Sequence, residues 1–217
     1  MSRPFDLIAF DWDGTLIDST ALISGSLQAA AADLGLPVPS HERASHVIGL
    51  GLAQALGYLF PELQADRYQH LAERYRFHFL AKDHEVALFE GVRELLPALR
   101  AQGYLLAVAT GKARRGLDRA LEQSGLSPLF DATRCADETA SKPHPMMLLE
   151  LIDELVVTAP RVLMIGDTTH DLQMAANAGT AAVAVSCGAH PAEELAREPH
   201  LAMLPTVAAL ADWLEKQ

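Results

Sequence analysis

A short apolar segment at residues 5–10 leads directly into two aspartates, Asp11 and Asp13, which are followed by Gly14 and Thr15. The apolar run predicts a buried strand with a charged break at its end. Two carboxylates at the mouth of a sheet repel each other unless a cation binds there or one carboxylate holds a proton. Because a metal-dependent active site meets both conditions, we predict such a site at the end of this strand.

Further strand-like runs alternate with helical patterns along the second half of the chain. Continuous runs of Val, Ile and Leu are typical of parallel strands that are buried on both faces. Alternating elements joined by right-handed crossovers predict an α/β fold with a doubly wound, mostly parallel sheet. Gly103 and Gly125 are expected to end two of the helices. The expected strands are 5–10, 104–109, 132–135, 161–165 and 181–185, and the helices 91–102, 113–124 and 145–155.

The interval between the first two expected strands breaks this alternation. It shows no strand pattern, and Ser40 is the expected N-cap of one of its helices. A helical block of this length is too long for a single crossover, so we predict an insert at 17–86 that lies over the first strand's carboxyl end. Residues 1–16 and 87–217 then form the core. The helices expected in the insert are 20–34, 40–47, 52–59 and 64–81.

Polar residues follow each expected strand of the core. Ligands of open α/β sheets bind outside the carboxyl ends of the strands, so these side chains are expected to converge. The set contains carboxylates, one hydroxyl and one ammonium, which suit a site for an anionic substrate and a cation. Its members are Asp11 and Asp13, Thr110 and Gly111, Lys142, and Asp167 and Asp171.

The order and spacing of these residues resemble the four signatures of the haloacid dehalogenase-like phosphohydrolases, beginning with Asp11-Trp12-Asp13-Gly14-Thr15. This resemblance spans nearly the whole chain and implies a Rossmann-like core. The helical interval resembles the α-helical cap of the subfamily that includes phosphoglycolate phosphatases. The segment 48–51, Ile-Gly-Leu-Gly, is similar to a glycine turn that such caps place near the substrate.

The resemblance implies a phosphatase that hydrolyses a small phosphate monoester, phosphoglycolate-like or a sugar phosphate. Asp11 would be the nucleophile that forms an aspartyl-phosphate. Asp13 would act as general acid and base. Thr110 and the Gly111 N–H would bind phosphoryl oxygens, and Lys142 would neutralise negative charge.

The implied cofactor is Mg²⁺, a hard cation that prefers oxygen ligands. Its ligands would be a carboxylate oxygen of Asp11, the backbone carbonyl of Asp13 and the carboxylate of Asp167. Asp171 would orient ligand waters or Lys142 without binding the metal itself. Four candidates for the substrate's leaving group are Gly49, Leu50, Lys112 and Arg114.

Two other functions share parts of this pattern. A sugar-phosphate mutase of the same superfamily shares every core residue, but needs cations in the cap for a second phosphate. The insert carries five cations against eight acidic residues, a balance that favours a phosphatase. A phosphoacceptor signalling domain also combines carboxylates, a hydroxyl and a lysine. Such a domain needs neither Asp13 nor a helical insert.

Composition limits the possible partners. A net charge of −11 with 28 acidic residues disfavours nucleic acid, and no apolar run reaches the length of a membrane span. No secretory signal is visible, and Cys135 and Cys187 match no metal-ligand spacing, so we expect free thiols in a cytoplasmic protein. The expected partner is a small phosphorylated metabolite, bound by a monomer or homodimer.

Three residues near the expected site are given no part in the chemistry. Trp12 is expected to pack away from the site, and His144 and His170 are expected to have no chemical role.

Overall fold

The computed structural model describes residues 3–217, so the first two residues of the predicted core lie outside this description. A parallel sheet forms the centre of the molecule, with the strand order β3-β2-β1-β4-β5-β6. This arrangement confirms the predicted α/β fold with a doubly wound sheet. The strands are β1 (Leu7–Phe10), β2 (Leu105–Thr110), β3 (Ala132–Cys135), β4 (Val162–Gly166), β5 (Ala181–Val185) and β6 (Ala202–Leu204).

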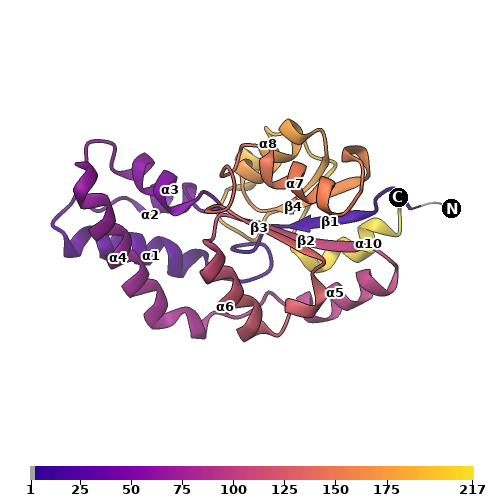
Figure 1. Cartoon of the computed structure of the whole chain (residues 1–217), viewed down its shortest axis with the longest axis horizontal. Helices are drawn as coiled ribbons and strands as arrows, with labels where there is room; N and C mark the ends of the chain where they lie inside the picture. Colours follow the sequence, from indigo (N-terminus) through magenta and orange to yellow (C-terminus); the bar gives the residue numbers. More distant parts are fainter. Residues whose placement is uncertain (1–2) are drawn as a thin grey trace.

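Helices surround this sheet and form a separate group at one end of it (Figure 1). In the part of the chain that is described, no helix is long and apolar enough to cross a membrane. The first helices are α1 (Thr20–Asp33), α2 (His41–His46), α3 (Leu52–Leu59), α4 (Ala65–Lys82) and α5 (Val92–Ala101). The later ones are α6 (Arg114–Ser124), α7 (Met146–Glu154), α8 (Thr169–Ala178), α9 (Ala192–Leu195) and α10 (Leu210–Leu214). Short 3₁₀ helices are η1 (Asp83–Glu85), η2 (Ser127–Leu129), η3 (Ala159–Arg161) and η4 (Val207–Ala209).

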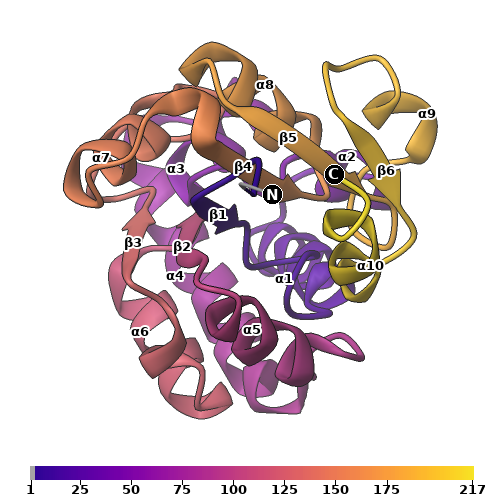
Figure 2. The ribbon, with the colours of Figure 1, turned by 90° about the vertical axis from the view of Figure 1, so that its right-hand side faces the viewer.

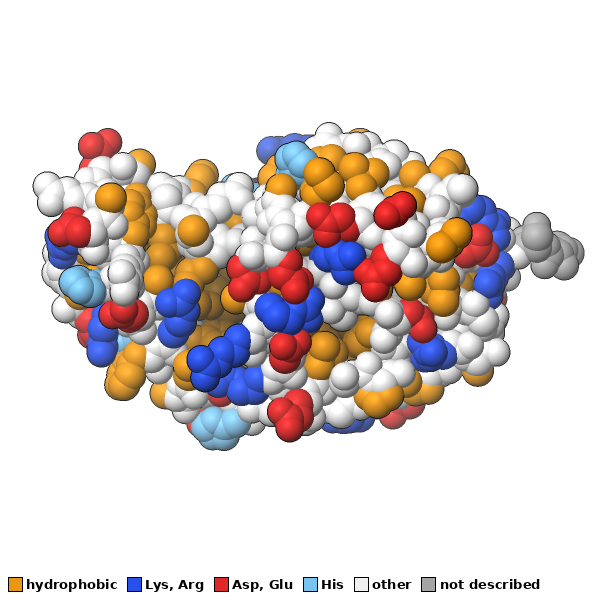
Figure 3. Space-filling model, viewed as in Figure 1, with side chains coloured by type: hydrophobic (Ala, Val, Ile, Leu, Met, Phe, Trp, Pro, Cys, Tyr) orange, Lys and Arg blue, Asp and Glu red, His pale blue; other side chains and the backbone are white. Residues whose placement is uncertain are grey.

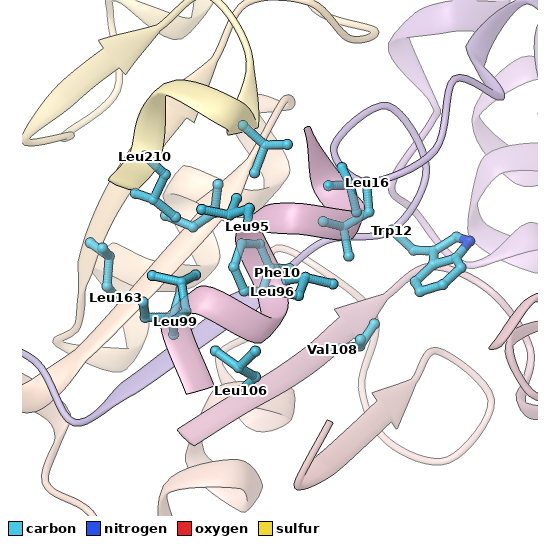
Figure 4. Packing of buried hydrophobic residues seen from close by; sticks show 14 of the residues in the cluster. Phe10, Trp12, Leu16, Leu95, Leu96, Leu99, Leu106, Val108, Leu163 and Leu210 are labelled. Carbon is cyan, nitrogen blue, oxygen red and sulfur yellow. The ribbon is translucent and has the colours of Figure 1, made fainter. Parts of the chain in front are cut away.

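The strand β1 lies in the middle of the sheet and contributes to two cores. Successive side chains of a strand point to opposite faces, so Ile8 and Phe10 join one cluster while Leu7 and Ala9 join the other. Helices α5, α6 and α10 cover the first face, and α7 and α8 cover the second (Figure 2). Figure 4 shows Phe10 packed among leucines of α5. Burial of each such large side chain stabilises the fold by about 1.5–3 kcal/mol.

Glycines end two of the core helices as the sequence predicts. Gly125 caps α6 in the left-handed conformation with φ of 72°, and Gly103, with φ of 86°, lies just beyond α5. The sequence analysis did not predict the strand β6 or the helices α9 and α10. The strand β6 is only three residues long and lies at the sheet's edge, which leaves little apolar pattern to detect.

The helices α1–α4, which we call the cap, lie beyond the carboxyl ends of the strands (Figure 1). They hold a third hydrophobic cluster of their own, which includes Leu27, Leu56 and Leu71. Ser40 caps α2, because its side chain accepts a hydrogen bond from the backbone N–H of Arg43. The boundaries of the predicted insert, 17–86, stay a prediction.

Candidate active site

The ends of three neighbouring strands bring the expected polar residues together. Asp11 directly follows β1, Thr110 ends β2, and Asp167 directly follows β4. The Asp11 N–H donates to the carbonyl of Ile165, which extends the β1–β4 pairing up to Asp11. All three polar side chains are buried. The central position of β1 therefore places Asp11 between the two other strand ends.

Lys142 supplies the cation of this group. Its Nζ lies 2.7 Å from Oδ1 of Asp11 and 2.7 Å from Oδ1 of Asp171. The lysine side chain is fully shielded from solvent, and at most 1% of either carboxylate side chain is exposed. A buried ammonium is stable only beside opposite charge, and the two carboxylates raise the pKa of Lys142 even though burial alone lowers it. Lys142 is therefore a fixed positive charge at the strand ends.

The surroundings of Asp11 disfavour the charged form of its carboxyl group. Burial raises its pKa well above the usual value, and the nearby charges of Asp171 and Asp167 raise it further, while Lys142 opposes them. Burial likewise raises the pKa of Asp167 to about 7, although Thr15 Oγ1 donates to its carboxylate at 2.7 Å. Carboxylates that repel one another in a buried site are stabilised by a bound cation.

The donor set fits a hard divalent cation. One oxygen each of Asp11, Asp167 and Asp171 lies within 4.8 Å of the others. Oδ2 of Asp11 is buried and finds no hydrogen-bond partner among residues 3–217, so this oxygen is free for a metal. Mg²⁺ takes such carboxylate oxygens together with waters. The residues present thus fit Mg²⁺, and the Asp13 carbonyl as a further ligand stays a prediction.

Asp171 is held by its own helix as well as by Lys142. Its Oδ2 accepts hydrogen bonds from the backbone N–H and the hydroxyl of Thr168, and the Thr168 hydroxyl accepts from the Asp171 N–H. This capping box starts α8 and fixes the carboxylate. The sequence analysis expected Asp171 to orient either ligand waters or Lys142, and the structure has the contact with Lys142. The role of Asp171 in the reaction stays a prediction.

Asp13 has different partners from Asp11. Its Oδ1 accepts a hydrogen bond from Ser19 Oγ at 2.5 Å and lies 3.0 Å from Nζ of Lys112. Asp13 and Lys112 also line a cavity of about 520 Å³ between the cap and the core. The two aspartates therefore face different surroundings: Asp11 a buried charge cluster, Asp13 a space that is large enough for part of a substrate.

The predicted glycine turn of the cap rests on the second strand's end. A Cβ atom on Gly111 would lie 2.5 Å from the carbonyl oxygen of Leu50 and 2.6 Å from that of Gly49, closer than such atoms approach. Gly49 has φ of 91°, which favours glycine. Gly51 N–H donates to Ser141 Oγ at 2.8 Å. Glycine at position 111 is therefore what allows the cap to lie so near the site.

A cluster of three histidines also joins the cap to the core, and no sequence pattern indicated it. Nε2 of His170 and Nε2 of His190 lie 2.9 and 3.0 Å from the backbone carbonyl oxygen of His46 in α2. The rings of His46 and His190 stack with centroids 4.9 Å apart. His170 is thus a contact between cap and core, and its lack of a chemical role stays a prediction.

The structure also places two further residues that the sequence analysis named. Arg114 does not line the cavity, because its guanidinium binds Glu138 through two hydrogen bonds and also contacts Asp118. Arg114, the first residue of α6, therefore holds the loop that contains Glu138. Trp12 is buried in the core as expected, yet it also forms part of the cavity wall beside Asp13.

Comparison with known proteins identifies the family. The family model described as haloacid dehalogenase-like hydrolase matches residues 8–185, which include every strand end discussed above. The chain belongs to this family. That result confirms the resemblance seen in the sequence.

Relatives of the family resemble the chain over nearly its whole length. A protein of Dickeya dadantii named "Probable phosphatase IndB" is 38% identical over 90% of this chain and 87% of its own. A phosphoglycolate phosphatase of Aliivibrio fischeri is 34% identical over 90% of each chain. The crystal structure of a predicted phosphoglycolate phosphatase from Haemophilus somnus is 27% identical, with a TM-score of 0.85, over 98% of this chain and 99% of that one. The chain thus resembles members that have both the core and the cap.

Proposed function

We propose that this haloacid dehalogenase-like hydrolase is a Mg²⁺-dependent phosphatase, which hydrolyses a small phosphate monoester through an aspartyl-phosphate on Asp11. The observation that carries the proposal is the buried Asp11 carboxylate, whose Oδ2 has no partner among the described residues while Lys142 lies 2.7 Å from Oδ1. The family and its phosphatase relatives support the same activity.

The first half of the reaction transfers the phosphoryl group to the enzyme. A carboxylate oxygen of Asp11 attacks phosphorus as the bond between phosphorus and the ester oxygen breaks. Asp13, on the cavity side, donates its proton to the departing alkoxide. Lys142 neutralises charge that develops on the phosphoryl oxygens, and the Thr110 hydroxyl and the Gly111 N–H bind those oxygens. Bound Mg²⁺ would supply further charge neutralisation.

The second half releases phosphate. Asp13, now a carboxylate, takes a proton from a water molecule that attacks phosphorus, and the bond to Asp11 breaks. Inorganic phosphate leaves, and both aspartates return to their starting protonation. The same residue thus gives a proton in one step and regains one in the next.

Phosphate release measured with Mg²⁺ and with EDTA tests this proposal. The substrates should include 2-phosphoglycolate, hexose phosphates and nucleoside monophosphates. Each should be assayed with wild type and with the variants Asp11→Asn and Asp18→Asn. Asp18 is an exposed carboxylate of the same loop and serves as a matched control. We expect turnover that needs Mg²⁺, persists in Asp18→Asn and disappears in Asp11→Asn. Turnover that survives in Asp11→Asn or in EDTA contradicts the mechanism.

The assay also separates the remaining functions. A mutase would convert one hexose phosphate isomer into another with little phosphate release, and a phosphoacceptor domain would stop after one phosphoryl group. Free Cys135 and Cys187 support a place in the reducing cytoplasm, with a phosphorylated metabolite as partner. Light scattering after gel filtration distinguishes a monomer from a homodimer.

A further inference from the structure

The cavity beside Asp13 provides information about the alcohol part of the substrate. It has a volume of about 520 Å³ and extends from Asp13 between the end of α4 and the helix α6. Figure 3 shows the surface hollowed between the cap and the sheet, with Lys and Arg side chains at its rim. Because Asp13 is the proposed proton donor to the alkoxide, the leaving group must lie on this side. The size of the cavity is typical of sites that enclose a whole small molecule.

The wall of this cavity is largely apolar and aromatic. Phe79 reaches in from α4, and its ring lies 4.8 Å from Nζ of Lys112. Ile17, Leu88 and Phe89 contribute further apolar surface. Such a wall gains most from a leaving group that brings an apolar or planar body. Glycolate, which has a two-carbon body, covers little of it.

The charges of the cavity are already balanced. Of the described residues that line it, three are Lys or Arg, and each has a partner. Lys112 lies 3.0 Å from Asp13, Arg119 lies 3.0 Å from Asp83, and Arg93 donates to a backbone carbonyl of α6 at 3.0 Å. Glu90 and Glu94 also line the cavity, beside Asp83. Even when Asp13 carries the proton that the mechanism requires, these three carboxylates match the three cations, so the cavity has no spare positive charge for a carboxylate or a second phosphate. The cavity therefore disfavours an anionic leaving group.

Trp12 adds a hydrogen-bond donor that lacks an acceptor. Its side chain is fully buried and lines the cavity, and its Nε1 has no hydrogen-bond partner among residues 3–217. Figure 4 shows the indole nitrogen on the side that faces away from the leucines of the core. A buried N–H without a partner is rare in folded proteins and points to an acceptor that the ligand supplies.

We propose that the leaving group of the substrate is a bulky, uncharged alcohol with a planar body and a hydrogen-bond acceptor, the class to which nucleosides belong. This inference rests on the proposed phosphatase activity. The apolar wall binds the planar body, the balanced charges exclude carboxylates and second phosphates, and the Trp12 N–H binds the acceptor. The preferred substrates are then nucleoside monophosphates and esters of similar shape, ahead of 2-phosphoglycolate and sugar bisphosphates.

Four esters separate leaving-group size from charge. Benzyl phosphate and uridine 5′-monophosphate carry large uncharged alcohols, ethyl phosphate a small uncharged one, and 2-phosphoglycolate a small anionic one. We expect kcat/KM for each large ester to exceed that for each small one by at least about 10-fold, the discrimination typical of an apolar pocket. Asp11→Asn should abolish turnover of all four.

Phe79→Ala tests the wall, and Phe77→Ala is the matched control. Phe77 lies on the same helix, but its side chain is 59% exposed and does not line the cavity. We expect Phe79→Ala to lower kcat/KM for benzyl phosphate by about 10-fold and that for ethyl phosphate by less than about 2-fold. Phe77→Ala should change neither value.

Trp12→Phe keeps an aromatic ring and removes the N–H. We expect it to lower kcat/KM for uridine 5′-monophosphate by about 5-fold more than kcat/KM for benzyl phosphate, because the benzyl ring has no hydrogen-bond acceptor. An equal loss for both esters overturns the role given to the Trp12 N–H.

The outcomes distinguish this inference from the activity on which it rests. If turnover depends on Asp11 but 2-phosphoglycolate or ethyl phosphate is the best substrate, the proposed leaving group is wrong and the phosphatase stands. A loss in Phe79→Ala that is equal for all four esters also overturns the inference. If no ester is hydrolysed, or if Asp11→Asn retains activity, the proposed function is wrong and the inference falls with it.

Discussion

Nζ of Lys142 lies 2.7 Å from Oδ1 of Asp11, and neither side chain is exposed to solvent by more than 1%. The ammonium thus holds the Asp11 carboxylate in place, and in the proposed mechanism it lies where negative charge develops during phosphoryl transfer. Lysine and methionine have similar length, so a substitution between them removes the charge with little change of shape.

Lys142→Met should therefore lower kcat by at least about 100-fold, because it removes a fixed positive charge from a buried reaction site. It also leaves the Asp11 and Asp171 carboxylates without their counter-ion, so we expect a lower melting temperature. Steady-state phosphate release and circular dichroism measure the two effects. Lys82→Met, on an exposed part of the cap, should change neither. A Lys142→Met enzyme with activity within about 10-fold of wild type contradicts the role given to this lysine.

Asp13→Asn separates the two proton transfers. An amide keeps the hydrogen bond with Ser19 but cannot exchange a proton. With p-nitrophenyl phosphate, whose leaving group needs little protonation, we expect a burst of about one product per enzyme, followed by turnover slowed about 100-fold or more. Stopped-flow absorbance measures the burst, and acid quenching recovers the aspartyl-phosphate. Absence of both the burst and the trapped intermediate contradicts Asp13 as the base of the second step.

Gly111→Ala should disturb the contact between the cap and the core. The new Cβ would lie 2.5 Å from the carbonyl oxygen of Leu50, so the cap turn has to move away. We expect kcat/KM to fall by at least about 10-fold, because sub-ångström placement of the phosphate site is lost. Gly57→Ala in α3 is the control, since nothing lies within 4 Å of its added methyl group. Equal kinetics of the two variants would show that the close approach is unimportant.

Glu138→Gln should change the response of stability to acid. The hydrogen bond from Arg114 lowers the pKa of Glu138 below its usual value. A carboxylate with a lowered folded-state pKa stabilises the protein above its unfolded pKa, about 4.3, and this contribution is lost as the pH falls through the folded-state pKa. Because the pair is partly exposed, its contribution is below about 1 kcal/mol.

Urea denaturation at several pH values measures this effect. Wild type should be more stable than Glu138→Gln at pH 7, and the difference should shrink as the pH falls below the unfolded pKa of about 4.3 and through the lowered folded-state pKa. Glu122→Gln, an exposed position on α6, is the control and should match wild type throughout. A difference that grows toward acid would mean that the Arg114 contact is not its source.

The sequence was sufficient for the central part of the site. Asp11, Thr110 and Asp167 each follow an apolar run, and the carboxyl ends of parallel strands meet at one edge, so their convergence follows from local patterns. The parallel sheet with a core on each face also follows from continuous apolar runs such as that of β1, which is buried on both faces. These features depend on short stretches of chain and on general rules of parallel sheets.

The remaining features depend on contacts between distant parts of the chain. The His46 carbonyl meets His170 and His190 only after the cap has docked on the core, and no spacing in the sequence indicates this. Arg114 seemed available for substrate because Glu138, its partner, belongs to another loop. The position of Trp12 in the cavity wall could not be predicted in this way. Strand alternation predicts which face of the sheet a side chain takes, but not what lies beyond the strand's end.

The pairing of β1 has a consequence for protein synthesis. This strand pairs with residues 105–108 on one side and with residues 162–165 on the other. The ribosome therefore makes Asp11, the proposed nucleophile, well before the strand β4 that pairs beside it and before Asp167. Long-range pairing of this kind forms slowly. On a nascent chain the proposed site therefore stays incomplete until β4 has been made and has paired with β1.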